Sequence, residues 1–180
     1  DTRPTLDKIK ETLFNILAPY IAGSSFLDLF SGSGSIGIEA LSRGSRFCVF
    51  VDHDKKAVQC IQENLEHTHL QEDALVISKN VLAAINELSI KGHCFDIVYM
   101  DPPYAAGQEE QVLSALIHSN IIHDDTMIII EADKHTDLSF APEIGFIITR
   151  EKLYKTNMHY FLKMQLEKKD NETGNLSRDI

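Results

Sequence analysis

The chain has 180 residues, of which 43% are hydrophobic and 24% charged, and its formal net charge is −10. This length suits one domain with a substantial core, and an excess of negative charge does not favour nucleic-acid binding. No apolar run reaches the roughly 20 residues of a membrane span, and no signal-peptide pattern opens the chain. Cys48, Cys60 and Cys94 form no CxxC pair, so we expect reduced thiols and a cytoplasmic protein.

Hydrophobic periodicity predicts an opening helix over residues 5–17, after Pro4, with an apolar stripe formed by Leu6, Ile9, Leu13, Ile16 and Leu17. Short apolar runs then alternate with helical segments. The expected strands are 25–30, 47–51, 75–78, 95–100 and 127–131, and the expected helices are 36–42, 55–67, 81–88 and 109–118. This alternation implies right-handed βαβ units and a parallel sheet that is covered on both faces.

After Asp133 the pattern changes. Two extended segments, 145–154 and 157–163, are joined by a short polar turn, which predicts an antiparallel hairpin that closes the sheet. Residues 166–180 are polar, and we expect a disordered tail. No repeat or linker divides the remainder, so the prediction is a single α/β domain over residues 1–165.

The charged residues are unevenly distributed along the chain. Acids dominate the middle, whereas bases gather near both ends, at Arg3, Lys8 and Lys10 and again at Arg150, Lys152, Lys155 and Lys163. Folding could bring these bases together on one basic face. Solvated helix and strand faces without a special purpose would explain the same charges.

A glycine-rich segment leads from the first expected strand into a helix. It reads Asp-Leu-Phe-Ser-Gly-Ser-Gly-Ser-Ile-Gly over residues 28–37, and Gly32, Gly34 and Gly37 satisfy G-x-G-x-x-G. Such glycines allow a tight turn and the close approach of a ligand to the helix N-terminus. Asp52 ends the next strand, 20 positions after Gly32, where a carboxylate would accept from ribose hydroxyls. These features fit a dinucleotide and S-adenosylmethionine equally well.

A second motif, Asp101-Pro102-Pro103-Tyr104, follows the apolar run at 95–100. The prolines stiffen the turn and lack N–H groups, which leaves the Asp101 carboxylate and the Pro102 carbonyl as neighbouring acceptors beside the Tyr104 ring. Two acceptors and a flat ring suit a planar group that carries an exocyclic NH2, such as a nucleobase. The alternative is an ordinary turn at the end of a strand, because Pro and Asp are common turn residues.

Two details favour S-adenosylmethionine as the cofactor. A carboxylate at Asp28 can face a positively charged amino or sulfonium group, but it would be repelled by a pyrophosphate. The amine-accepting turn lies at the same edge of the predicted sheet as the glycine loop, so a methyl donor and an amine would meet in one crevice. A nicotinamide oxidoreductase would leave residues 101–104 without a role. For Asp28 the structural alternative is a helix-capping or turn residue.

With these motifs the chain resembles class I S-adenosylmethionine-dependent methyltransferases, and more narrowly the bacterial family that methylates N2 of a guanine in 16S ribosomal RNA (the RsmD type). Three stretches carry the resemblance: Arg3-Pro-Thr with Lys8, Lys10 and residues 13–17; the glycine segment with residues 36–44; and residues 101–104. The resemblance implies a Rossmann-like, seven-stranded, mostly parallel sheet with helices on both faces. Its C-terminal hairpin would insert the seventh strand antiparallel.

The resemblance also implies roles for single residues. Catalysis would involve Asp101, Pro102, Pro103 and Tyr104, with the ring of Tyr104 stacked on the base. Cofactor contacts would come from Asp28, Phe30, Ser31, Gly32, Gly34, Asp52, His53, Asn80 and Val81. Substrate contacts would come from Arg3, Thr5, Lys8 and Lys10, on an N-terminal helix over residues 1–20 that covers the active site. Two departures are Asn80, where the family more often has an acid, and Lys155, where it tends to have Gly.

The expected reaction is methyl transfer from S-adenosylmethionine to the N2 amine of a guanine in 16S ribosomal RNA. The acidic body favours a monomer that acts on an assembling small ribosomal subunit over one that captures naked RNA. Alternatives are transfer to DNA adenine or protein glutamine, or a catalytically silent nucleic-acid-binding module on the same fold. His67 and His69 lack a third ligand at a suitable spacing, so they are interpreted as a polar helix end and no metal is expected.

Overall fold

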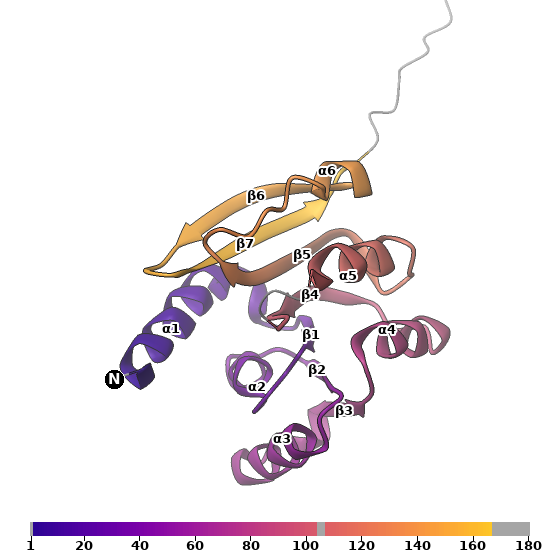
Figure 1. Ribbon diagram of the computed structural model, residues 1–180. Coiled ribbons are helices and arrows are strands. Elements are labelled where there is room, and N and C mark those ends of the chain that lie inside the picture. The colour runs from indigo at the N-terminus through magenta and orange to yellow at the C-terminus, as the bar shows by residue number, and fades with distance from the viewer. Residues whose placement is uncertain (1, 104–106, 167–180) are drawn as a thin grey trace, which may run out of the picture.

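The chain folds around a seven-stranded sheet whose strand order is β3-β2-β1-β4-β5-β7-β6 (Figure 1). The computed structural model describes residues 2–103 and 107–166, with side chains from residue 5 onward. The strands are β1 (Ser25–Leu29), β2 (Phe47–Asp52), β3 (Ala74–Ser78), β4 (Phe95–Met100), β5 (Ile122–Asp133), β6 (Phe146–Leu153) and β7 (Asn157–Met164). The first five strands are parallel to one another, and β7 lies antiparallel between β5 and β6. The predicted topology is confirmed, including the inserted antiparallel strand.

Helices cover both faces of this sheet (Figure 1). One face carries α1 (Thr2–Ile21), α2 (Ser35–Ser42) and α3 (Lys55–Thr68), and the other carries α4 (Val81–Ile90), α5 (Gln108–Ile117) and the short α6 (Ala141–Ile144). A single 3-10 turn, Gln71–Asp73, precedes β3. The sequence pattern did not predict this turn or α6, because each is shorter than the windows in which periodicity can be recognised.

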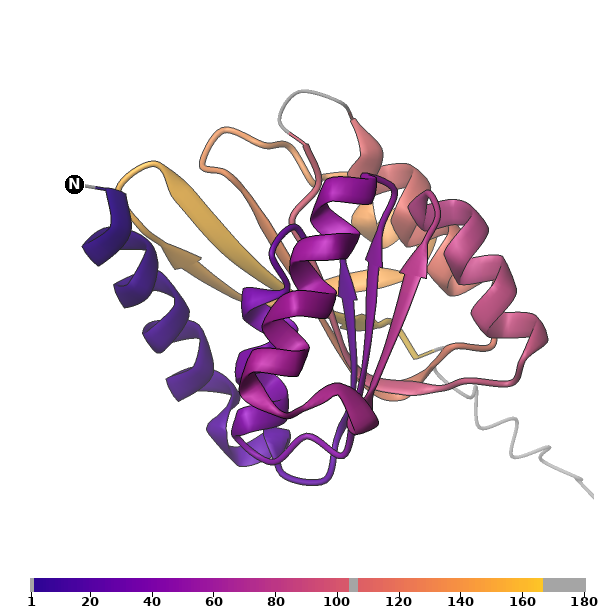
Figure 2. The same ribbon diagram turned by 90° about the horizontal axis from the view of Figure 1, so that it is seen from below.

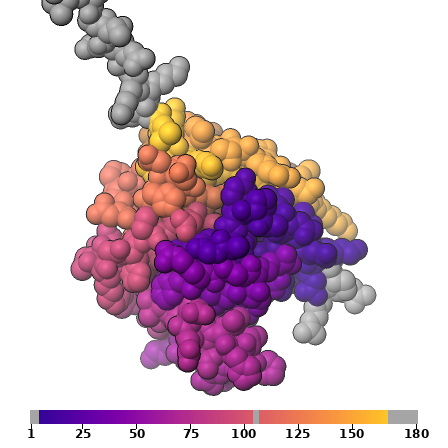
Figure 3. Space-filling model, turned by 180° about the vertical axis from the view of Figure 1, so that it is seen from behind, coloured from indigo at the N-terminus to yellow at the C-terminus, as the bar shows by residue number. Residues whose placement is uncertain are grey.

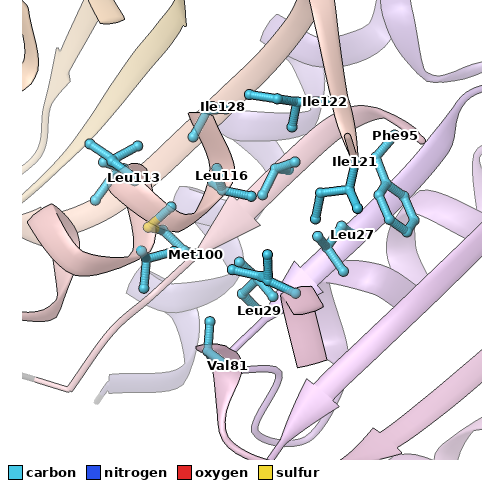
Figure 4. Close-up of a cluster of buried hydrophobic side chains, with 14 of the residues drawn as sticks. Leu27, Leu29, Val81, Phe95, Met100, Leu113, Leu116, Ile121, Ile122 and Ile128 are labelled. Atoms are coloured by element: carbon cyan, nitrogen blue, oxygen red, sulfur yellow. The ribbon is translucent and has the colours of Figure 1, made fainter. Parts of the chain in front are cut away.

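Successive side chains of the central strands point to opposite faces, so each strand supplies two cores. Leu27, Leu29 and Met100 pack toward α4 and α5, together with Leu113 and Leu116 of α5 (Figure 4). The alternate residues belong to the second core, which the helices α1, α2 and α3 cover. Its members include Phe14, Phe26, Phe50, Tyr99, Ile129 and Phe161. All of these strand residues are buried, which explains the near-continuous apolar runs in the sequence.

Helix α1 departs from its predicted apolar stripe. Leu13, Phe14 and Leu17 are fully buried, but Leu6 is 57% exposed. Figure 2 shows the first turns of α1 diverging from the sheet, whereas the later turns pack on it. The predicted helix is confirmed, but its apolar stripe is buried only in the second half of the helix, which lies over the sheet.

Strand β5 also begins earlier than predicted, at Ile122. Its first half carries polar residues, and its pairing with β4 is irregular between Phe95 and Ile97. Thr126 stabilises this irregular part, since its Oγ1 donates to Phe95 O at 2.6 Å and accepts from His123 N at 2.9 Å. The predicted helix end at His67 and His69 agrees with the structure. Helix α3 ends at Thr68, and His69 adopts a left-handed conformation.

Across residues 2–103 and 107–166, no helix combines the length and apolar character that crossing a bilayer requires. Within the same residues, no three His, Cys, Asp or Glu side chains form a group that could hold a metal ion.

Candidate active site

The glycine loop joins β1 to α2, and hydrogen bonds to residues of β1 and β2 fix it. Ser31 N donates to Val51 O at 2.9 Å. The Ser31 hydroxyl accepts from Val51 N at 3.0 Å and donates to Asp28 O at 2.5 Å. On the other side of the loop, Gly32 N donates to the Asp52 carboxylate at 2.9 Å. These bonds hold the loop at the carboxyl edge of the sheet, where ligands of open α/β sheets bind.

The three glycines of the motif serve different needs. Gly34 has φ +80°, and a Cβ there would lie 3.3 Å from Ile61 and Phe50. Gly37 lies in the first turn of α2, where a Cβ would come within 2.4 Å of the Phe50 ring and 2.7 Å of Cys48 Sγ. Gly32 has φ +57° and no atom within 4 Å of the Cβ position. Two glycines therefore let α2 pack closely on β2, and Gly32 leaves its backbone accessible.

Asp28 is almost fully buried beneath the start of α2. One carboxylate oxygen accepts from Gly37 N at 3.1 Å, so Asp28 satisfies a free amide of the first turn of that helix. The capping alternative raised by the sequence therefore describes a real contact. Burial raises the pKa of Asp28 well above its usual range, the Gly37 bond opposes this rise, and the Asp101 charge adds to it. A nearby cation would relieve the cost of ionising this carboxyl.

Two cavities meet at the glycine loop. A central cavity of about 300 Å³ lies between α1, the loop, the carboxyl ends of β4 and β5 and the amino end of the antiparallel β7, and Asp28, Ser31 and Gly32 are among its lining residues. A side cavity of about 180 Å³ is lined by Phe30, Asp52, His53, Asn80, Val81, Pro103 and Gln108. Phe30 lines both cavities and has φ +57°, a conformation that costs an L residue about 1–2 kcal/mol. Such strain often marks functional sites.

All of the cofactor residues named from the sequence line one of these two cavities, except Gly34, which packs against Ile61 and Phe50. Two of them also have structural roles that the sequence did not reveal. The second Asp52 oxygen accepts from Asp54 N at 2.9 Å. The Asn80 amide oxygen accepts from Ala83 N at 2.9 Å and thereby caps α4. An amide oxygen has two lone pairs, so this cap leaves Asn80 one further acceptor position.

The turn after β4 stands where the cavities converge. Asp101 lines the central cavity and also a neighbouring acidic cavity of about 610 Å³, whose other lining residues include Glu109, Glu110 and Asp137. Pro102 is buried against the acidic cavity, and Pro103 lines the side cavity. Tyr104 lies outside the described residues. Asp101 therefore faces both the central and the acidic cavity, and its catalytic role stays a prediction.

Asp101 opens into the cavities and is itself exposed, but it sits in a recess walled by protein. The surrounding protein displaces water from the carboxyl, and the charge of Glu131 adds to this effect. Together they raise the pKa of Asp101 to about 7. Near neutral pH this carboxyl is therefore poised between accepting and holding a proton.

Sequence reasoning missed a polar cluster next to Asp101, which we call the Glu131 network. Glu131, at the end of β5, accepts from the Tyr99 hydroxyl and, at 3.3 Å, from Asn157 Nδ2. His159 is fully buried, with Nε2 3.5 Å from Glu131 and Nδ1 3.0 Å from the Tyr154 hydroxyl. Glu131, Tyr99 and His159 line the central cavity. The only sequence signal was an acid that ends an apolar strand, as Asp28 and Asp52 do.

The residues expected to contact the substrate are spread along the start of α1. Lys10 lines the central cavity, and its Nζ donates to Ser35 Oγ at 3.2 Å at the N-terminus of α2. Thr5 and Lys8 are exposed and do not line the cavities described above. The Arg3 side chain lies outside the described residues. Among the described side chains of this group, Lys10 is the one that the structure brings to the glycine loop.

The bases near the C-terminus do not share one face. Lys152 and Lys155 lie at or next to the β6–β7 turn. This turn lies beside the carboxyl end of β5, since Asn157 pairs with Asp133. Lys163 lies toward the other end of β7 and lines a separate cavity with Tyr20 and Asp96. The hypothesis of one basic face therefore fails for Lys163.

Comparison with known proteins identifies the relatives of this chain. The family model described as "Conserved hypothetical protein 95" matches residues 1–163. The chain belongs to this family. It is 38% identical over 151 residues to ribosomal RNA small subunit methyltransferase D of Haemophilus influenzae, covering 83% of this chain and 77% of that protein. The family predicted from the three stretches, the Arg3-Pro-Thr segment with its helix, the glycine segment and residues 101–104, is confirmed.

Solved structures agree with the fold. The protein yhhF of Escherichia coli, provisionally named a methyltransferase, superposes with a TM-score of 0.79 at 30% identity, covering 90% of this chain and 87% of that one. A SAM-dependent methyltransferase from Agrobacterium tumefaciens superposes with a TM-score of 0.66 at 16% identity, covering 91% of this chain and 63% of that one, which shows the shared fold. The class I methyltransferase fold and the enzyme class are thereby confirmed.

Proposed function

We propose that this protein transfers the methyl group of S-adenosylmethionine to the exocyclic N2 amine of a guanine in 16S ribosomal RNA. One observation carries the proposal: the Asp101 carboxylate opens into the central cavity at the point where the glycine loop and the side cavity meet it. This arrangement sets an amine acceptor beside a site for a charged methyl donor. The small-subunit methyltransferase relative supports the choice of 16S ribosomal RNA.

The cofactor spans the two cavities in this proposal. Its adenosine occupies the side cavity, where the Asp52 carboxylate accepts from the ribose hydroxyls and Asn80 borders the adenine. Its methionine part occupies the central cavity, where the buried Asp28 faces the ammonium group. The carboxylate of the methionine lies toward the N-terminus of α2, beside Lys10. Phe30, which lines both cavities, separates the two halves.

The protein accelerates the reaction mainly by positioning the amine. The N2 lone pair of guanine is delocalised into the ring, and hydrogen bonds to the Asp101 carboxylate and the Pro102 carbonyl turn it toward the sulfonium methyl. Acceptors fixed on a stiff proline turn supply this orientation without reorganisation during the reaction. The base is extruded from its surroundings to reach the cavity and stacks on Tyr104.

The substrate in this proposal is a particle that contains protein as well as RNA. A chain with a net charge of −10 repels free RNA except where local bases face it, so an assembling small ribosomal subunit is a better partner than naked RNA. In this proposal the enzyme acts as a monomer in the cytoplasm, where small ribosomal subunits assemble.

The test is methyl transfer from labelled S-adenosylmethionine to small ribosomal subunits that lack their native guanine-N2 methylation, followed by nucleoside analysis. We expect the label in N2-methylguanosine. Asp101→Ala should lower the rate by about 100-fold or more, the usual cost of removing one group that orients the transition state, and should leave cofactor affinity nearly unchanged. Label in another nucleoside would refute the guanine assignment, and equal loss of binding and turnover would refute the role of Asp101.

A further inference from the structure

The Glu131 network holds a carboxylate charge inside the protein. The Glu131 side chain is only 13% exposed, and an ion in such a place costs several kcal/mol unless hydrogen bonds compensate. Tyr99, Asn157 and His159 all direct polar atoms at its two oxygens. Burial alone would raise the pKa of Glu131, but these partners lower it below its usual range. Glu131 is therefore built to remain an anion.

The network goes beyond what packing requires. His159 is fully buried, and its Nε2 has no hydrogen-bond partner closer than the Glu131 oxygen at 3.5 Å. Tyr154 meets the other ring nitrogen at 3.0 Å and so orients the imidazole toward Glu131. Strands β4 and β7 thus supply three partners to one carboxylate of β5 at the wall of the central cavity. Such supporting contacts are typical of groups that tune a reacting residue.

That reacting residue is Asp101. Asp101 and Glu131 together line both the central cavity and the acidic cavity, at the ends of the adjacent strands β4 and β5. Among the described residues, no hydrogen-bond donor engages the Asp101 carboxylate, whereas Glu131 is engaged on both oxygens. Two neighbouring carboxyls with such different surroundings take up protons with very different affinities.

We propose that Glu131 is a positioning residue, an anchored anion that keeps the Asp101 carboxylate ready to take the proton which the acceptor amine releases. The inference rests on the proposed function and deepens it. The N2 lone pair forms a bond to the methyl carbon, and the carbon–sulfur bond breaks with its electron pair going to sulfur. The methylated nitrogen then carries a positive charge and an extra proton, which passes to Asp101 and from there to water.

Other charges around Asp101 are part of this balance. In the central cavity it faces Asp7 and Lys10 of α1, Asp28 of β1, Tyr99 of β4 and His159 of β7. In the acidic cavity it faces Glu109 and Glu110 of α5, and Asp133, His135 and Asp137 at or beyond the end of β5. Desolvation and the charge of Glu131 raise the pKa of Asp101, and Asp28 and Asp101 also repel each other. Asp28 belongs to the proposed cofactor site, so the control substitution is made at an exposed acid of the acidic cavity.

The test compares Glu131→Gln with the wild type in single-turnover methylation of small subunits between pH 5 and 9. The wild-type rate should fall as the pH drops below about 7, because Asp101 becomes protonated and can no longer accept. Glu131→Gln should move this acid limb at least about one pH unit lower and reduce the plateau rate about tenfold, since a weaker base accepts the proton. Glu110→Gln, which removes an exposed acid of the same cavity, should leave the limb in place.

A purely structural role predicts a different result: Glu131→Gln would slow the reaction equally at every pH with the limb unmoved, and that outcome would overturn the proposal. Carbon-13 NMR titration of the wild-type carboxyls is a second test that needs neither a variant nor a substrate. Asp101 should titrate near 7, and titration near its ordinary value of about 4 would also overturn the proposal. A wild type that binds cofactor but methylates no subunit would refute the proposed function, while the titration would still report on the two carboxyls.

Discussion

At the scale of single residues, the buried carboxyl of Asp28 makes the stability of the fold depend on pH. Burial raises its pKa in the folded chain above the unfolded value, so the protonated form favours folding. That stability is fully present below the unfolded pKa and is lost as the pH rises through the folded pKa. A side chain that remains neutral would avoid this loss and still accept from Gly37 N, as the present carboxylate does.

Asp28→Asn should therefore be more stable than the wild type at pH 8, with the advantage shrinking toward pH 4. A gain of 1 kcal/mol would raise the Tm by about 2–4 °C for a chain of this size. Cofactor affinity should fall about tenfold, because the neutral amide attracts an ammonium group less strongly. Thermal melts across pH and equilibrium titration with S-adenosylmethionine measure both quantities. A stability difference that does not change with pH would contradict this account.

Single residues could be predicted where a short motif determines their surroundings. The strand–loop–helix around Gly32 and Asp28, and the proline turn after Met100, each place neighbouring residues at the sheet edge by local geometry alone. Glu131 could not be found in this way. Its partners Asn157 and His159 come from an antiparallel strand that returns beside β5, and nothing in the sequence spacing specifies that register.

At the scale of elements, α1 combines two functions that share one apolar pattern. Figure 3 shows this helix between the C-terminal hairpin and α2. Phe14 is fully buried there, with the Arg43 guanidinium 5.2 Å from its ring centroid. Leu6, two turns earlier, is mostly exposed and lines the central cavity. The second half of α1 therefore holds the helix in place, and the first half walls the site.

Truncating side chains in the two halves should separate these functions. Phe14→Ala should lower the free energy of unfolding by about 3–5 kcal/mol, as for other buried aromatic residues. Leu6→Ser should change it by less than about 0.5 kcal/mol, because the side chain is already in water, but should raise the KM for the small subunit severalfold. Chemical denaturation and steady-state kinetics test the pair. A destabilised Leu6→Ser with normal kinetics would mean that Leu6 belongs to the core.

The same helix shows where prediction of elements ends. The alternation of apolar runs and helical segments predicted every long strand and helix in order, because both faces of a parallel sheet must be buried. It did not predict how far each element lies over the sheet. An apolar periodic pattern is the same where the sheet covers the helix, as at Leu13, and where the helix extends past the sheet, as at Leu6. The start of β5 was not predicted because it is polar. Hydrogen bonds of Thr126 stabilise this part of the strand in place of apolar packing.

At the scale of the whole molecule, the bases lie near two opposite ends of the central strands. Lys155 follows β6 in the turn beside the end of β5, and Lys8 lies on the exposed first turns of α1. Figures 1 and 2 place the start of α1 and the β6–β7 turn on the same side of the molecule. Lys163 lies toward the opposite end, among the residues that line a cavity with Asp96 and Asp125. Only the first group can meet a substrate that enters the central cavity.

This separation predicts which charges contribute to binding of the small subunit. Each base that contacts a phosphate releases counterions on binding, so neutralising it lowers the slope of log affinity against log salt by about 0.7–0.9. Lys8→Gln and Lys155→Gln should each weaken binding and reduce the slope by that amount. Lys163→Gln removes an equal charge far from the central cavity, so it should change neither the affinity nor the slope. The measurement is the affinity of each variant for the small subunit across a series of potassium chloride concentrations. An equal effect of all three substitutions would show that net charge alone governs recognition of the particle, whatever the position of the base relative to the central cavity.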